Sequence, residues 1–239
     1  MSIRNCIVRG NSAGTGGGIS IDILDPSGGP AEVIDCLITD NRATMGNGGG
    51  LWFIGRSTDA SFLVKRCEIL RNSAKTSGGG LFIGNASFLT GARSVTVSEC
   101  FISENSAESN GGGGCLWASV DPDAEYITES CVISENHSGR SGAWQLSNSG
   151  GANTVVNCLV VDNSVGVGSR GGIVALPSRG STQKVYVTNS TIVGNEGYGI
   201  YNYGGDFMTV INCVVRGSGE EEIYSRNDLT VAHSNVEGG

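Results

Sequence analysis

The chain has 239 residues and a formal net charge of −8, which excludes the basic stripe that a nucleic-acid partner requires. Only four prolines and 38% apolar residues exclude a disordered chain, and the 39 glycines lack the strict every-third spacing of collagen. No apolar run approaches the ~18 residues of a transmembrane helix, so no transmembrane segment is expected.

One short phrase returns nine times along the chain, at spacings of 21 to 33 residues. Its copies occupy residues 5–11, 35–41, 66–72, 99–105, 130–136, 157–163, 189–195, 212–218 and 233–239. A repeat of this length predicts a stacked solenoid, and we expect one continuous domain over residues 1–239. Because Met1 falls almost directly onto the first copy, without a signal peptide or a cap, we expect this sequence to be a fragment of a longer protein.

Most copies carry a cysteine as their second residue, and the residue two positions further on is always aliphatic. These aliphatic residues are Val8, Ile38, Ile69, Ile102, Ile133, Val160, Ile192, Val215 and Val236. The residue between them varies freely and includes Glu68 and Thr191, so the period of two predicts a strand with the cysteine and the aliphatic residue facing inward. Three residues before the cysteine position, a valine recurs at 33, 64, 97, 155, 187, 210 and 231. The mostly polar residues between valine and cysteine indicate a corner that joins two short strands.

A glycine cluster follows most copies, at residues 16–18, 48–50, 78–80, 111–114 and 171–172. Glycine permits positive φ and close backbone approach, which indicates a tight corner. A third strand then opens with an inward aliphatic residue at Ile19, Leu51, Leu81, Leu116, Ile173, Ile200 and Ile223. Three short strands per repeat, without a helical period, predict an all-β parallel β-helix of about eight coils.

The pairing of Cys-x-Ile-x-x-Asn-x-Ala with Gly-Gly-Gly-Leu resembles bacterial right-handed β-helix proteins, and especially the repeat of chlamydial polymorphic outer-membrane proteins. Where that repeat has Phe-x-x-Asn, this chain has phrases such as Ile38-Thr-Asp-Asn41. The resemblance covers essentially the whole chain and implies a right-handed solenoid. Such repeats occur in adhesins, autotransporter passengers and polysaccharide-degrading enzymes, so the resemblance implies an architecture more than an activity.

Two inward rows are interpreted as structural. The cysteine row contains Cys6, Cys36, Cys67, Cys100, Cys131, Cys158 and Cys213. In-register side chains point the same way, which favours buried free thiols over disulfides, and Ser190 and Ser234 in the same position fit a size requirement. The asparagine row contains Asn11, Asn41, Asn72, Asn105, Asn136, Asn163 and Asn195, whose amides can hydrogen-bond along the stack.

The residue after the inward aliphatic of the third strand is predicted to face outward. It is aromatic in several coils, and we expect an exposed column of Trp52, Phe82, Trp117, Trp144, Tyr201 and Tyr224. Such a patch indicates a glycan-binding surface, a protein or self-interface, or a surface covered by the protein's own loops. Cys115 replaces the last glycine of its cluster and is expected to be an outward thiol.

Acidic residues raise the question of calcium. Glu104, Glu135 and Asp162 share one register beside the asparagine row, near Asp40, and either bind calcium or form a solvated acidic edge. No other cofactor is expected. Among possible catalytic or calcium-binding groups the best is Asp121, Asp123 and Glu125, although no residue is predicted as catalytic.

These features predict a non-enzymatic, extracellular or cell-surface β-helix with a structural or adhesive role, which contacts a protein or a glycan through the aromatic column. The alternative is a polysaccharide lyase or glycoside hydrolase of the pectate-lyase type. Terminal coils are open sheet edges, so end-to-end self-association is also predicted.

Overall fold

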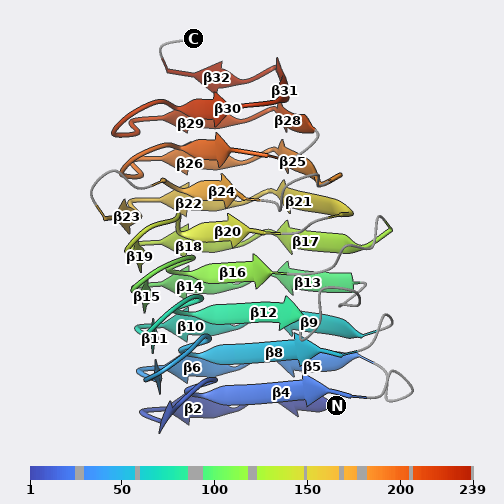
Figure 1. Cartoon of the computed structure of the whole chain (residues 1–239), viewed down its shortest axis with the longest axis vertical. Coiled ribbons are helices and arrows are strands. Elements are labelled where there is room, and N and C mark those ends of the chain that lie inside the picture. Colours follow the sequence, from blue (N-terminus) through green and yellow to red (C-terminus); the bar gives the residue numbers. More distant parts are fainter. Residues whose placement is uncertain are drawn as a thin grey trace.

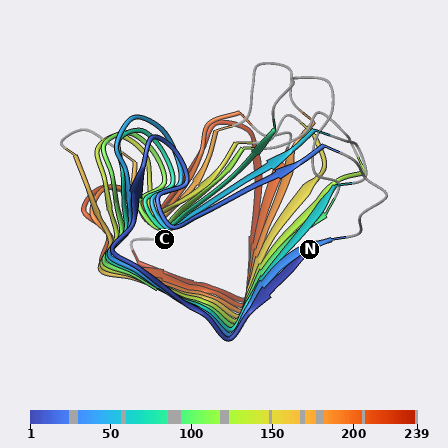
Figure 2. The same ribbon diagram turned by 90° about the horizontal axis from the view of Figure 1, so that it is seen from below.

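The computed structural model describes residues 1–24, 30–56, 60–85, 94–117, 123–147, 150–166, 170–176, 182–204 and 207–237. The strands in these residues form four parallel sheets, here named A to D, whose coils stack from the N-terminal end to the C-terminal end (Figure 1). Viewed along the stack, the coils superpose (Figure 2). The chain passes from sheet A around a corner to sheet B, continues through sheet C and returns along sheet D.

Sheets A and B contain the strands on either side of the cysteine corner. Sheet A consists of β1 (Ser2–Arg4), β5 (Ala31–Ile34), β9 (Ser61–Lys65), β13 (Ser94–Ser98), β17 (Glu125–Glu129), β21 (Ala152–Val156), β25 (Lys184–Thr188), β28 (Phe207–Ile211) and β31 (Asp228–Ala232). Sheet B consists of β2 (Ile7–Arg9), β6 (Leu37–Thr39), β10 (Glu68–Leu70), β14 (Phe101–Ser103), β18 (Val132–Ser134), β22 (Leu159–Val161), β26 (Thr191–Val193), β29 (Val214–Arg216) and β32 (Asn235–Val236).

Sheets C and D complete each coil. Sheet C consists of β3 (Ser12–Ala13), β7 (Arg42–Ala43), β11 (Ser73–Ala74), β15 (Ser106–Ala107), β19 (His137–Ser138) and β23 (Ser164–Val165). Sheet D consists of β4 (Ile19–Ile23), β8 (Leu51–Gly55), β12 (Leu81–Asn85), β16 (Gly114–Trp117), β20 (Trp144–Leu146), β24 (Ile173–Ala175), β27 (Ile200–Asn202) and β30 (Ile223–Ser225).

The predicted fold class, an all-β parallel β-helix, is confirmed, with two differences in detail. A full coil has four strands instead of three, because the two-residue strands of sheet C are too short to show a period of two in the sequence. In the described residues, sheets A and B each contain nine strands, against the eight or so coils expected.

Two corners of every coil require a left-handed backbone conformation. The residue before the cysteine position has φ between 49 and 54° throughout, from Asn5 in the first coil to His233 in the last. The residue four positions after the cysteine is either glycine or has φ between 50 and 57°, as in Asp40 and Arg71. Asn, Asp and Gly tolerate this conformation best, which explains why the two positions are rich in these residues.

The cysteine row lies inside the A–B corner. All eight cysteines are free, and those of the row are buried except Cys6, which is half-buried in the first coil. Each thiol of the row donates a hydrogen bond to the backbone carbonyl two residues earlier, as Cys100 does to Ser98 at 3.1 Å. The thiols therefore fill the corner as small side chains and satisfy a carbonyl that the bend leaves available.

The asparagine row lies inside the B–C corner and forms a continuous hydrogen-bonded ladder. The backbone N–H and the side-chain amide of Asn72 both donate to Oδ1 of Asn105, at 2.9 and 3.0 Å. Nδ2 of Asn105 donates in turn to Oδ1 of Asn136 at 3.0 Å and to the carbonyl of Ile69 at 2.8 Å. Because these side chains are fully buried, the ladder supplies the partners that water cannot.

The glycine cluster brings the start of sheet D against the asparagine corner. A Cβ on Gly79 would collide with the backbone oxygens of Ser106 and Gly112, so no other residue fits at this position without movement. The close approach makes sheet D begin at the equivalent position in each coil. The side chains on its outer face therefore lie in rows along the stack.

Candidate functional site

The register of sheet D defines one row of residues on its outer face. Successive strands pair Ser20, Trp52, Phe82, Cys115, Gln145, Val174, Tyr201 and Tyr224 with one another. Of the six residues in the predicted column, Trp52, Phe82, Tyr201 and Tyr224 belong to this row. The other two, Trp117 and Trp144, do not.

Trp144 is on the inner face, and the prediction that it faces outward is wrong. It pairs with Gly114 on one side and Ile173 on the other, is fully buried, and donates from Nε1 to Oγ1 of Thr128 at 3.0 Å. A Cβ on Gly114 would meet the indole ring, so the fourth glycine of that cluster leaves room for Trp144. The predicted register differs from the observed one by one residue in this coil, and a displacement of one residue reverses the face of a strand.

Trp117 faces outward but lies outside the row. It pairs with Gly84, two residues beyond Phe82, and is 48% exposed. Its ring contacts Phe82 edge-on, with 6.5 Å between centroids. A displacement of two residues preserves the face of a strand, which is why its exposure agrees with the prediction while its register does not.

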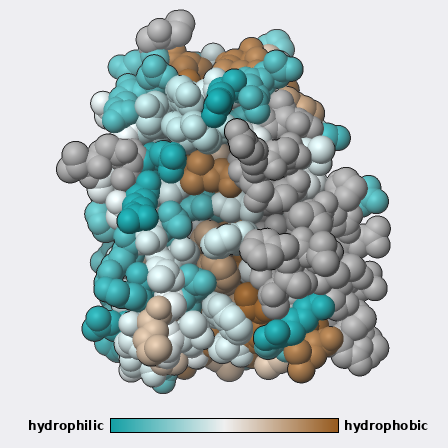
Figure 3. Space-filling view, in the orientation of Figure 1, coloured by the Kyte–Doolittle hydropathy of each residue, from teal (hydrophilic) through white to brown (hydrophobic). Residues whose placement is uncertain are grey.

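The N-terminal part of the row is closed, so the predicted run of exposed aromatic residues in consecutive coils is wrong. Phe82, Cys115 and Ile54 are 4%, 1% and 6% exposed, and Trp52 packs against them in a second apolar cluster outside the main core. Cys115 therefore has the outward register expected of it but is buried. Figure 3 shows this face of the molecule, where apolar patches lie between more hydrophilic regions.

The C-terminal part of the row is different, since tyrosines and arginines gather there over three neighbouring coils. We call this group the tyrosine surface; it consists of Tyr198, Tyr201, Tyr203, Tyr224, Arg170 and Arg226. Tyr201 is at its centre and is only 8% exposed, so the prediction that its ring is exposed is wrong, because neighbouring tyrosine rings pack against it. Its ring stacks on Tyr224 with 4.8 Å between centroids and 13° between planes, and it is nearly parallel to Tyr203 at 6.1 Å.

The two arginines contact the tyrosine rings from neighbouring coils. The guanidinium of Arg170 lies 5.0 Å from the ring centre of Tyr201, and that of Arg226 lies 5.0 Å from the ring centre of Tyr203. Tyr203 is 44% exposed, so its ring is held by neighbours and yet open to solvent. Cation–π contacts of this kind fix the orientation of ring and guanidinium together.

A carboxylate borders the tyrosine surface at Tyr198. The side-chain hydrogen bond to Glu220, together with burial and the negative charges of Glu220 and Glu221, raises the pKa of Tyr198 to about 12. The phenol therefore stays protonated and donates to the carboxylate. The surface thus presents aromatic faces, cationic donors and an anionic acceptor within one area.

Tyr198, Tyr203 and both arginines were absent from the predicted site. The spacing of Tyr201 and Tyr203 is a usable signal, since Tyr203 directly follows β27 and residues two apart in extended backbone share a face. Arg170 and Arg226 gave no such signal, because each reaches the tyrosines from a different coil.

The acidic row lies at a corner of the coil. Glu104, Glu135 and Asp162 occupy the left-handed position that follows sheet B, with φ of 56, 54 and 52°. Asp40, at the same position, pairs with Arg71 at 3.0 Å, and this hydrogen-bonded ion pair lowers the pKa of the Asp40 carboxyl. In the part of the chain that the structure describes, no group of three or more His, Cys, Asp or Glu residues could hold a metal ion. Calcium binding by this row stays a prediction.

The structure does not describe the whole of the second acidic group, which consists of Asp121, Asp123 and Glu125. Asp121 lies outside the described residues, whereas Glu125 begins β17 in sheet A with its side chain exposed. Asp123 precedes that strand. The polysaccharide lyase or hydrolase alternative therefore also stays a prediction.

Comparison with known proteins places the chain by its fold. The family model described as the right-handed β-helix region matches residues 2–215. No curated protein and no solved structure showed a significant match. The described residues contain no helix long and apolar enough to cross a membrane. With parallel sheets stacked along nearly its whole length and a family match over the same residues, the chain belongs to the right-handed β-helix family.

Proposed function

We propose that this β-helix is a non-enzymatic protein with a structural or adhesive role, which binds glycans through the tyrosine surface at an extracellular or cell-surface location. The observation that carries the proposal is the exposed ring of Tyr203, stacked on Tyr201 and held by Arg226. A ring that is both fixed and exposed can accept the apolar face of a sugar with little loss of side-chain entropy.

The polar groups around the rings suit a ligand with many hydroxyls. Arg226 and Arg170 are permanent hydrogen-bond donors, while the carboxylate of Glu220 is an acceptor that is already oriented by Tyr198. A sugar hydroxyl both donates and accepts, so it can use both kinds of group. Few polar groups around an apolar contact are typical of specific small-ligand sites.

The proposed structural or adhesive role is supported by the β-helix architecture and by the similarity of the repeated phrases to those of other β-helix proteins. A stacked solenoid presents side chains at regular intervals on a rigid surface, which suits adhesion as well as scaffolding. The finer likeness to the repeats of chlamydial polymorphic outer-membrane proteins supports a surface location and rests on the repeated phrases alone.

A glycan array tests the proposal directly. We expect the 239-residue chain to retain at least one glycan class and Tyr203→Ala to weaken that binding by about tenfold, because the stacking face is lost. Tyr186→Ala is the matched control, since Tyr186 also stands in an outward position and pairs edge-on with Phe207, but on sheet A. The control should bind as the parent chain does.

Two outcomes would contradict the proposal. Retention of no glycan, or equal losses in Tyr203→Ala and Tyr186→Ala, would remove the tyrosine surface as a glycan site. Cleavage of the retained glycan, measured as new reducing or unsaturated ends, would instead favour the enzyme alternative.

A further inference from the structure

Sheet C carries a groove on its outer face. The groove has a volume of about 480 Å³ and is formed by the coils of β7, β11, β15 and β19. The register of these strands produces one outward row, which contains Arg42, Ser73, Ser106 and His137. Neighbouring coils are about 4.8 Å apart, so the two serines form a low floor between a guanidinium and an imidazole. Because β3 and β23 extend sheet C on either side, the groove does not depend on the ends of the stack.

Three hydrogen-bond donors of this row are without a partner in the described part of the chain. The guanidinium of Arg42 is exposed, and no salt bridge or hydrogen bond among the described residues involves it. The hydroxyls of Ser73 and Ser106 are half-buried and likewise have no hydrogen-bond partner there. Donors that border a groove without internal partners are available to a ligand.

The other polar groups of the groove have partners within the chain and form its walls. Nζ of Lys75 lies 2.6 Å from Oε2 of Glu108, and this salt bridge is neutral as a pair. Nδ1 of His137 lies 2.9 Å from Oγ of Ser164, one coil further along the stack. Arg42 therefore gives the groove a positive charge, although the whole chain has a formal net charge of −8. Such a local charge attracts an anion.

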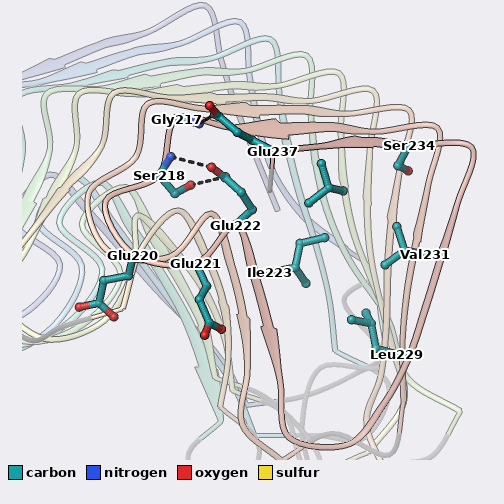
Figure 4. A pocket seen from close by; sticks show the side chains of 11 residues that line it. Gly217, Ser218, Glu220, Glu221, Glu222, Ile223, Leu229, Val231, Ser234 and Glu237 are labelled. Carbon is teal, nitrogen blue, oxygen red and sulfur yellow. Dashed lines mark hydrogen bonds between the residues drawn. The ribbon is translucent and has the colours of Figure 1, made fainter. Parts of the chain in front are cut away.

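Another hollow of the molecule has the opposite character. It lies on the last coils, has a volume of about 1030 Å³ and is bordered by Glu220, Glu221, Glu222 and Glu237 (Figure 4). There the backbone N–H and the hydroxyl of Ser218 donate to the carboxylate of Glu222, at 3.1 and 2.7 Å. The donors of that serine are thus used by a carboxylate of the chain, whereas no described carboxylate pairs with the serines of the groove. An external anion is therefore repelled by the hollow and attracted by the groove.

The arrangement of the donors indicates which kind of anion fits. The guanidinium of Arg42 can offer two parallel N–H groups, and the hydroxyl of Ser73 lies one coil away. A phosphate ester has three terminal oxygens, one for each of these donors, whereas a carboxylate has two. Further along the groove, the hydroxyl of Ser106 is a donor and Oε1 of Glu108 is an acceptor. Sugar hydroxyls both donate and accept, so they can use both groups.

We propose that the groove of sheet C binds a sugar phosphate. The phosphate group contacts Arg42 and Ser73, and the sugar hydroxyls contact Ser106 and Glu108. This site is separate from the tyrosine surface, because the two lie on different sheets of the coil, and it does not rest on the proposed glycan binding there. With one ion pair and a few hydrogen bonds at an open surface, we expect a Kd on the order of 1 mM.

A chemical-shift titration of the isotope-labelled 239-residue chain with glucose 6-phosphate tests the proposal. We expect saturable shifts at the amides of Arg42, Ser73 and Ser106, which weaken with added salt. Glucose should cause none, because it lacks the anion, and glucuronate should bind several-fold more weakly, because its carboxylate has only two oxygens. Arg42→Gln should raise the Kd for glucose 6-phosphate by about tenfold, since it removes the charge-assisted contacts.

A matched control separates this site from a general effect of charge. Arg216→Gln removes the same charge from an exposed position on sheet B and should bind glucose 6-phosphate as the parent chain does. Circular dichroism should show the parent fold in both variants. The absence of saturable shifts overturns the proposal, as do equal losses in the two variants or equal affinity for glucuronate. Loss of binding in Tyr203→Ala would assign the contact to the tyrosine surface and overturn it too.

Discussion

The two faces of sheet D follow different rules. Its inner face is filled in every coil, with Leu51, Leu81 and Ile173 in equivalent buried positions and the complementary pair Gly114 and Trp144 between them. Its outer face changes along the stack, from the buried cluster around Phe82 to the tyrosines and arginines around Tyr201. The inner face must fill a cross-section of constant size, whereas the outer face has no such restriction.

This difference indicates where function can lie in a repeated fold. Residues that recur in every coil, such as the asparagine ladder, satisfy needs that every coil has. A group that occurs only in the last coils, such as the tyrosine surface, is not required for the structure of each coil. Substitutions should therefore affect stability on the inner face and binding or chemical reactivity on the outer face.

The largest expected effect separates two tryptophans of the same sheet. Trp144→Ala should lower the free energy of unfolding by about 4 kcal/mol, because it empties a buried volume and leaves the hydroxyl of Thr128 without its donor. Trp117→Ala should cost less than about 1 kcal/mol, since that ring is half exposed. Urea denaturation followed by circular dichroism measures both, and equal costs would contradict the assignment of their faces.

A smaller effect tests the pairing of Gly114 with Trp144. Gly114→Leu should destabilise the chain by about 2 kcal/mol, because a side chain there collides with the indole ring. Adding Trp144→Leu should recover part of that loss, since neighbouring coils hold leucine in this row. A double-mutant cycle from urea denaturation measures the coupling, which we expect to be about 1 kcal/mol or more. Strict additivity would show that the two positions do not share space.

Thiol reactivity compares the buried part of the outer face with an end of the stack. Burial raises the pKa of Cys115 to about 12, so at pH 8 only about one thiol in ten thousand is ionised. We expect Cys115 to resist alkylation in the folded chain, whereas Cys6, which is half-buried in the first coil, should react first. Peptide mapping after iodoacetamide treatment identifies the sites. Rapid labelling of Cys115 would show that the outer face is open there.

The smallest effect is a shift in the titration of one tyrosine. The pKa of Tyr198 is raised in the folded chain from 10.0 to about 12, so the stability from its hydrogen bond to Glu220 is complete below pH 10 and is lost as the pH rises through 12. Glu220→Gln should move the pKa of Tyr198 back toward 10. Absorbance at 295 nm follows the phenolate, and the substitution Tyr198→Phe identifies its contribution. An unchanged titration would exclude the contact with Glu220.

Much of the architecture could be predicted from the chain alone because each coil obeys the same local rules. The period of two around residues such as Ile69 and Ile102 indicates strands, and the recurring glycines indicate a corner. Sheet C could not be predicted, because a strand of two residues has no measurable period. The site was predicted only in part: Tyr201 and Tyr224 were in the expected column, but the arginines were not.

The sequence by itself determined the coil, its inward rows and the corners that need asparagine or glycine, since these follow from spacing within one repeat. Only the tertiary structure decided which face Trp144 occupies, because its register depends on the space that Gly114 leaves in the neighbouring coil. The structure likewise brought Arg170 and Arg226 to the tyrosines from coils on either side. Contacts between coils depend on register, and a shift of one residue, which hardly alters a sequence pattern, moves a side chain to the opposite face.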